Sequence, residues 1–134
     1  MGPDSTSIVR ARDVMNKGIV SIDGMATAKE AAAQMRSEKV SCLLVKKRHE
    51  DDAWGMLVIQ DFIKGVIMLG RSPAEVNVYE IMTKPIITVP ADMDIRYVAR
   101  LIHRAGIRRA PVEDKGELIG MISLSSLILD NELF

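Results

Sequence analysis

The stretch "DVMNKGIVSI", residues 13–22, returns as "EIMTKPIITV", residues 80–89. The shift between the two stretches is 67 positions, and it aligns Met15 with Met82. A self-similar pattern at this spacing indicates that one supersecondary unit occurs twice in the chain. The repeat therefore decides which architectures are open to this sequence.

The alignment continues through the rest of each copy. "VSCLLV" from Val40 falls on "IRRAPV" from Ile107, and "GMLVIQDF" from Gly55 corresponds to "GMISLSSL" from Gly120. The last shift is 65 positions, so the second copy is two residues shorter before its Gly-led phrase. The loss falls in the polar stretch "KKRHEDDAW", residues 46–54, as expected of a hairpin connection.

Each copy has the same predicted order of secondary structure. A short first strand is predicted at residues 18–22 and again at 85–89, where apolar residues dominate. Amphipathic helices are predicted at 27–39 and 94–106, because apolar side chains recur there at helical spacing. A hairpin and a closing helix complete each copy.

The second hairpin is the better defined of the two. Its strands are predicted at residues 109–114 and 117–123, with Lys115 and Gly116 at the tip. The chain is therefore predicted to be an α/β protein with two β-α-β-β-α repeats packed about a pseudo-twofold axis.

The predicted domain boundaries follow the repeat. Residues 10–70 form the first copy and residues 78–134 the second. The stretch "RSPAEVN", residues 71–77, is interpreted as a linker, because its proline interrupts any continuous helix. Residues 1–9 are predicted to be a flexible tail.

Composition argues against several classes of function. Among 134 residues, 18 are basic and 18 are acidic, so the chain lacks the broad positive field of a general nucleic-acid binder. No apolar stretch approaches the roughly 20 residues of a membrane-spanning helix, and the start lacks a secretory pattern. The single Cys42 is interpreted as a buried core thiol. A cytoplasmic protein without nucleic-acid or membrane partners is expected.

In the order, spacing and duplication of its motifs, the chain resembles a tandem pair of CBS domains, the Bateman module. The resemblance extends from Arg10 to the end of the chain. It rests on "DVM" and "EIM", on "GIRRAPVED" and on the two Gly-led phrases. In the family, the Gly-led phrase usually continues with two apolar residues, Thr or Ser, two variable residues and Asp.

The resemblance implies a regulatory module rather than an enzyme. Similar modules bind AMP, ADP, ATP or S-adenosylmethionine in the cleft between their two CBS domains and signal to a partner protein. An adenine nucleotide is then a regulatory ligand, and no cofactor or metal is required. Such modules commonly dimerise through their helices, so a homodimer with a still unknown regulated partner is expected.

The resemblance also implies that each cleft is composite, with the Gly-led phrase of one copy opposite the first strand and the middle segment of the other. The favoured cleft comprises Met56, Val58, Asp61, Ile86, Ile87, Ile107, Arg108 and Arg109. The weaker cleft comprises Ile19, Val20, Val40, Ser41, Met121, Ser123 and Ser126.

The favoured cleft has the better chemistry for a nucleotide. The two carboxylate oxygens of Asp61 match the two hydroxyl donors of a ribose, and an arginine offers a guanidinium to phosphate. Ser126 takes the place of a carboxylate in the weaker cleft. Because strand side chains alternate, one of Arg108 and Arg109 is expected to face the ligand.

Structural explanations compete with each of these assignments. Ser123 is equally well explained as a helix N-cap, which Ser126 would extend. The apolar Val58 argues against a cap at Asp61, although an acid in the first helical turn is still favoured by the helix dipole. The arginines are alternatively solvated or paired with acids such as Asp114.

A rival function is a ligand-free interaction or assembly domain whose clefts are degenerate. The missing hydroxyl at Val58 and the missing carboxylate at Ser126 favour it. "HEDD", residues 49–52, is interpreted as a solvated hairpin tip rather than a metal site, because adjacent side chains on a turn converge poorly. Cys42 lacks a histidine partner in any catalytic signature.

Overall fold

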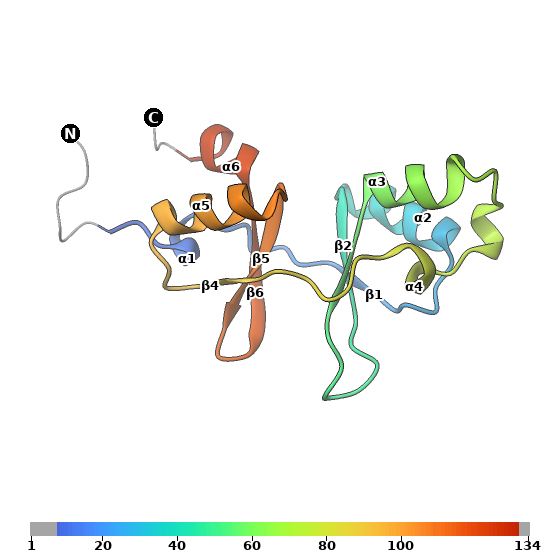
Figure 1. Ribbon diagram of the computed structural model, residues 1–134, viewed down its shortest axis with the longest axis horizontal. Helices are drawn as coiled ribbons and strands as arrows, with labels where there is room; N and C mark the ends of the chain where they lie inside the picture. Colours follow the sequence, from blue (N-terminus) through green and yellow to red (C-terminus); the bar gives the residue numbers. More distant parts are fainter. Residues whose placement is uncertain (1–7, 132–134) are drawn as a thin grey trace. The chain divides into compact units, whose positions relative to one another are not determined.

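The computed structural model describes residues 8–131, and the chain divides into two compact units (Figure 1). The middle unit is Val20–Ile86, and the terminal unit combines residues up to Ile19 with residues from Ile87 onward. Neither unit is one copy of the repeat, because each contains the opening helix of the other copy. The predicted boundaries, 10–70 and 78–134, thus describe the repeat along the sequence and not the compact units.

The middle unit is built on a three-stranded sheet of order β1-β2-β3. Strand β1 is parallel to β2, and β2 is antiparallel to β3. Its elements are β1 (Ser21–Ile22), α2 (Ala28–Glu38), β2 (Cys42–Val45), β3 (Gly55–Val58), α3 (Ile59–Phe62), a π-helix (Ile63–Ile67), a 3-10 helix (Pro73–Glu75) and α4 (Val78–Ile81). The β2–β3 connection extends away from α2 and α3 (Figure 1).

The terminal unit has the same topology, with sheet order β4-β5-β6. Strand β4 is parallel to β5, and β5 is antiparallel to β6. Its elements are α1 (Ala11–Val14), β4 (Val89–Pro90), α5 (Ile95–Ala105), β5 (Arg109–Asp114), β6 (Glu117–Ser123) and α6 (Leu124–Leu129). The predicted α/β class, with two three-stranded sheets and their helices, is confirmed.

Local signals explain why the two long helices form where they were predicted. Helix α2 begins after Thr27, whose Oγ1 accepts a hydrogen bond from the Glu30 N–H at 3.1 Å. The Glu30 carboxylate accepts one from the Thr27 N–H at 3.0 Å, which completes a capping box. Helix α5 begins after Asp94 and ends at Gly106, a left-handed residue.

The predicted second hairpin is confirmed in its bounds and its tip. Lys115 and Gly116 both have positive φ, 52° and 82°. Two such residues between antiparallel strands form a turn whose twist matches that of the strands.

The first strands are shorter than predicted. Only Ser21–Ile22 and Val89–Pro90 join the sheets, although 18–22 and 85–89 were expected. The reason is that the preceding residues carry the chain from one unit to the other. They therefore pair only where they arrive at the sheet.

Each unit buries its own apolar cluster, and each cluster includes residues of both copies. Val78 of the second copy is fully buried among Leu43, Val45 and Leu57 of the first. In the terminal unit, Ala11 and Val14 belong to a cluster with Val89, Ala91, Val98, Ile102, Ala110, Val112, Ile122 and Leu127. Since a copy of this size buries little surface alone, the exchanged helices complete the two cores.

Close backbone contact ties each exchanged helix to a Gly-led phrase. Met56 and Thr83 exchange two backbone hydrogen bonds of 2.9 Å, beside Gly55. A Cβ at Gly55 would lie 2.8 Å from Met82 Sδ. The "EIM" motif and the "GM" phrase are therefore two sides of one contact.

The terminal unit repeats this contact more tightly. Asn16 and Met121 exchange backbone hydrogen bonds of 2.9 and 2.8 Å. A Cβ at Gly120 would lie 2.5 Å from Met15 Sδ and 2.8 Å from the Asn16 carbonyl oxygen. Because that oxygen belongs to a bridged backbone, it has little freedom to move away.

We expect Gly120→Ala to destabilise the protein by about 1–3 kcal/mol, the usual cost of overpacking. The loss should appear as a lower midpoint in urea unfolding followed by circular dichroism. Gly18→Ala is the control, because a Cβ at Gly18 has no neighbour within 4 Å. Equal stability of the two variants would contradict the proposed role of Gly120.

Candidate functional site

Asp61 lies at the point where β3 runs into α3. Its Oδ2 accepts a hydrogen bond of 2.8 Å from the Val58 N–H, so the carboxylate caps the start of the helix. The expectation that Val58 argues against a cap is therefore wrong, because this cap needs only the backbone of Val58. Burial raises the pKa of Asp61, against the opposing effects of the Val58 N–H and the Lys64 charge.

The corresponding serines of the terminal unit are also used as a cap. Ser123 Oγ accepts a hydrogen bond from the Ser126 N–H at 3.1 Å, and Ser126 Oγ donates one to the Ser123 carbonyl at 2.9 Å. Ser126 is only 6% exposed. The cap interpretation of Ser123, extended by Ser126, is confirmed.

The two arginines begin the β5 segment. Arg108 is exposed, and Arg109 is half-buried and opposite Ser123 in the antiparallel ladder. This difference fits the alternation of side chains along a strand. Asp114 pairs with Arg12, whose Nη2 lies 3.6 Å from Asp114 Oδ2.

In each unit, the structure brings together residues that were assigned to different clefts. In the middle unit, the start of β2, after Val40 and Ser41, lies beside the end of β3 at Val58. In the terminal unit, Arg109 lies beside Ser123.

Each predicted cleft draws its residues from both units. The middle unit contains Val20, Val40, Ser41, Met56, Val58, Asp61 and Ile86. The terminal unit contains Ile19, Ile87, Ile107, Arg108, Arg109, Met121, Ser123 and Ser126. The ligand roles of these residues remain predictions.

Two other sequence interpretations need correction. Cys42 is half-buried rather than fully buried, because it is the first residue of β2 and lies at the end of the sheet. Asp52 belongs to "HEDD" but is not a solvated tip residue, since its side chain is only 7% exposed. Its burial depends on Lys84, which is 32 positions away in sequence.

Within residues 8–131, no group of three or more His, Cys, Asp or Glu side chains is placed to hold a metal ion. Over the same residues, none of the helices combines the length and the apolar character needed to cross a membrane.

A comparison with family models matches the CBS domain twice, at residues 11–67 and 78–129. The chain belongs to the CBS-domain family. Both matches include the bridge-forming segments and the strand ends described above, so the repeat identified in the sequence is a tandem CBS pair. Proteins of this type are generally regulatory.

Solved structures support the same assignment. The hexameric CBS-CP12 protein from bloom-forming cyanobacteria is 36% identical, with a TM-score of 0.86 over 93% of this CBS protein and 72% of that chain. Hypoxic Response Protein I, solved with two coordinated zinc ions, is 26% identical, with a TM-score of 0.73 over 89% of this chain and 96% of that one.

Curated relatives are longer than this CBS protein. The mitochondrial CBS domain-containing protein CBSX3 of Arabidopsis thaliana is 32% identical over 138 residues, which cover 95% of this chain but 65% of CBSX3. An uncharacterized protein of Methanopyrus kandleri is 30% identical, and 61% of its length is covered.

We expect Ser123→Ala to cost about 0.5–2 kcal/mol of unfolding free energy, because the first turn of α6 loses its N-cap. Chemical unfolding measures this loss. Ser37→Ala is a suitable control, since Ser37 is exposed near the end of α2 and alanine favours helix. A variant as stable as the wild type would show that the Ser123 hydroxyl contributes little as a cap.

Proposed function

We propose that this protein is a regulatory module that binds an adenosine-containing ligand, namely AMP, ADP, ATP or S-adenosylmethionine, between its two CBS domains. The observation that carries the proposal is the environment of Asp61. Its carboxylate is half-buried at the start of α3, and burial raises its pKa. A desolvated carboxylate gains more from a ligand's hydroxyl donors than a fully hydrated one does.

The hydrogen bond from the Val58 N–H uses one oxygen of the Asp61 carboxylate and leaves the other oxygen for a ligand. Oδ2 is held by the Val58 N–H, which fixes the orientation of the group. Oδ1 is then the acceptor that we assign to the ribose hydroxyls. Half-buried Met56 and Ile86 supply apolar surface for a purine, and the exposed guanidinium of Arg108 suits a phosphate.

The caps also favour the Asp61 cleft over the other one. The hydroxyls of Ser123 and Ser126 already serve the start of α6, and Ser126 is buried. Neither serine adds a charge that would retain a ribose. We therefore propose that the cleft containing Asp61 is the occupied one.

Signalling to a partner requires that the ligand prefer one arrangement of the protein. The chain passes between its units at Ile19–Val20 and at Ile86–Ile87. All four residues were assigned to the clefts. A ligand in the Asp61 cleft would therefore contact Ile86–Ile87, one of the two segments that connect the units, and it would bias the conformation of that segment.

Asp61→Asn tests the ribose contact and keeps an acceptor for the Val58 N–H. We expect AMP to bind more weakly by about 1.5–3 kcal/mol, or roughly ten- to a hundredfold in Kd, because the charge-assisted hydrogen bonds are lost. Isothermal titration calorimetry measures this change. Ser126→Ala should leave the Kd nearly unchanged, and similar losses in both variants would contradict the choice of cleft.

The pH dependence of the same titration gives a second readout. Because the pKa of Asp61 is raised, its carboxylate takes up a proton at a higher pH than an ordinary aspartate does. Ligand affinity is thus complete above that pKa and declines as the pH falls through it, which begins at a higher pH than for an ordinary aspartate. Asp61→Asn should show only the dependence that arises from the ligand's own titration.

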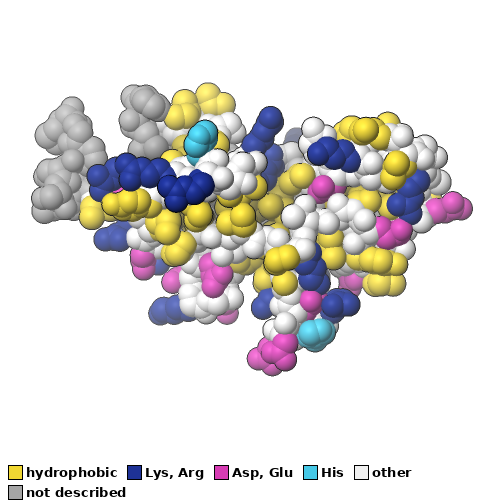
Figure 2. Space-filling view, viewed as in Figure 1, with side chains coloured by type: hydrophobic (Ala, Val, Ile, Leu, Met, Phe, Trp, Pro, Cys, Tyr) yellow, Lys and Arg dark blue, Asp and Glu magenta, His cyan; other side chains and the backbone are white. Residues whose placement is uncertain are grey.

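An exposed apolar surface supports the predicted homodimer, and with it the rival role in assembly. Ile67, Met68 and Leu69 are 67%, 70% and 65% exposed at the end of the helix that α3 begins. Hydrophobic side chains gather over this region in Figure 2. A groove of about 410 Å³ beside them is lined by Met35 of α2 and Phe62 of α3, among others. The similar CBS-CP12 protein is hexameric.

Ile67→Glu should shift the protein toward monomer, because a charge placed in an apolar interface has to be desolvated. Light scattering after size-exclusion chromatography measures the mass. Met25→Glu is the matched control, since Met25 has a similar exposure of 70% but does not line the groove. If Ile67→Glu retains the mass of the wild type, this surface is not the interface.

A further inference from the structure

A second cavity lies within the middle unit, at the end of the sheet opposite Asp61. Strands β1 and β2 are parallel, so their carboxyl ends meet there. The cavity has a volume of about 520 Å³ and is lined by residues that follow these two strands, together with residues of the α4 segment. Its size is within the range of small-molecule sites, roughly 300–1,000 Å³, and the carboxyl ends of strands commonly form them.

Four basic side chains line this cavity: Lys46, Lys47, Arg48 and Lys84. Asp23 lines it as well, and its Oδ1 accepts a hydrogen bond of 2.8 Å from the Met25 N–H. Lysine and arginine side chains both supply hydrogen-bond donors and contain no acceptor. We name this feature the basic cavity.

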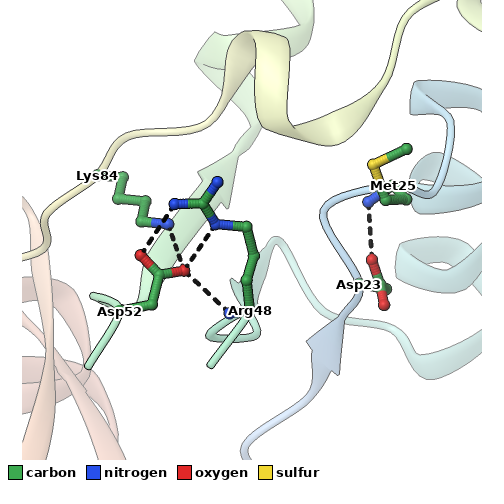
Figure 3. A network of polar contacts seen from close by, with 5 residues as sticks. All are labelled: Asp23, Met25, Arg48, Asp52 and Lys84. Atoms are coloured by element: carbon green, nitrogen blue, oxygen red, sulfur yellow. Dashed lines mark hydrogen bonds and ion pairs between the residues drawn. The ribbon is translucent and has the colours of Figure 1, made fainter. Parts of the chain in front are cut away.

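Buried Asp52 positions two of the four cations. Its Oδ2 lies 2.7 Å from Lys84 Nζ and 3.1 Å from Arg48 Nε. Figure 3 shows both side chains directed toward the Asp52 carboxylate. The hydrogen bond from Arg48, followed by that from Lys84, holds the pKa of Asp52 well below its usual range. Asp52 therefore remains an anion. The basic cavity has a net positive charge, because its four cations outnumber the two carboxylates of Asp23 and Asp52.

The terminal unit contains the equivalent cavity with the opposite charge. At the shift of 67 positions, Glu113 and Asp114 replace Lys46 and Lys47. Both acids line a cavity of about 430 Å³ at the ends of β4 and β5. Since one framework carries either charge, the fold itself does not require lysines at the end of β2.

The side chain that the opening helix contributes near the cavity differs between the two units as well. In the terminal unit, Arg12 from α1 pairs with Asp92 at 2.9 Å and with Asp114 at 3.6 Å, so a cation of the chain itself offsets part of the negative charge. The same shift places Tyr79 at the position of Arg12. Tyr79 brings no carboxylate to the basic cavity, and its half-exposed ring forms an apolar wall.

We propose that the basic cavity binds a small polyanionic phosphate compound, of the class of a diphosphate. Lys46 and Lys47 supply charge at its mouth, where both are exposed. Arg48 and Lys84, oriented by Asp52, supply directed donors to phosphate oxygens. This site does not use Asp61 and is independent of the adenosine ligand proposed above.

Inorganic pyrophosphate is the probe, titrated into the full chain by calorimetry at constant ionic strength. The test variant is Lys46→Glu with Lys47→Asp, which copies the acidic pair of the terminal unit and therefore suits the framework. We expect its Kd for pyrophosphate to rise at least tenfold. The wild-type affinity should also decrease as salt is added, because the contacts are ionic.

The control variant is Lys29→Glu with Arg104→Asp, which changes the net charge equally at exposed positions outside the basic cavity. It should bind pyrophosphate nearly as well as the wild type. An equal loss in both variants, or no heat from millimolar pyrophosphate with the wild type, overturns the proposal.

Asp61→Asn separates the two proposed sites. It should leave pyrophosphate binding unchanged, while the acidic double variant should leave AMP binding unchanged. Loss of pyrophosphate binding in Asp61→Asn would mean that the anion binds in the Asp61 cleft, and it would overturn the basic cavity as a separate site.

Discussion

The contact between a glycine and a methionine is the constraint on which both units depend. Gly55 lies against Met82, and Gly120 lies against Met15, with a pair of backbone hydrogen bonds beside each contact. A side chain at either glycine would occupy the space of the methionine. The contact explains why the "DVM" and "EIM" motifs and the Gly-led phrases occur in the same chain. The same contact places a helix of each copy in the core of the unit that holds the sheet of the other copy.

The polar residues after each glycine perform one structural task with different chemistry. Asp61 caps α3 through its carboxylate, and Ser123 and Ser126 cap α6 through their hydroxyls. The serines satisfy one another, whereas the carboxylate keeps a charge in a half-buried place. A helix cap and a ligand contact are therefore not exclusive explanations of Asp61. The cap holds the group in the orientation that a ribose contact would need.

Charge distinguishes the copies more than fold does. The two sheets have the same order and the same parallel and antiparallel pairs. At equivalent positions, however, the middle unit has Lys46 and Lys47 where the terminal unit has Glu113 and Asp114. Arg12 pairs with Asp92 and Asp114, whereas Tyr79, at the position equivalent to Arg12, brings no charged partner to the lysines. A duplicated framework thus carries one acidic cavity whose charge Arg12 partly offsets and one cavity that retains positive charge.

The sequence by itself determined the repeat, the two long helices and the second hairpin, because short-range signals specify them. Thr27 and Glu30 are three residues apart, and Lys115 and Gly116 are adjacent. The family resemblance supplied the candidate clefts. Only the tertiary structure decided that the opening helices are exchanged, that the first strands are short and that Asp52 is buried beside Lys84. These features depend on contacts between residues far apart in sequence, for which neither periodicity nor capping patterns leave a local signal.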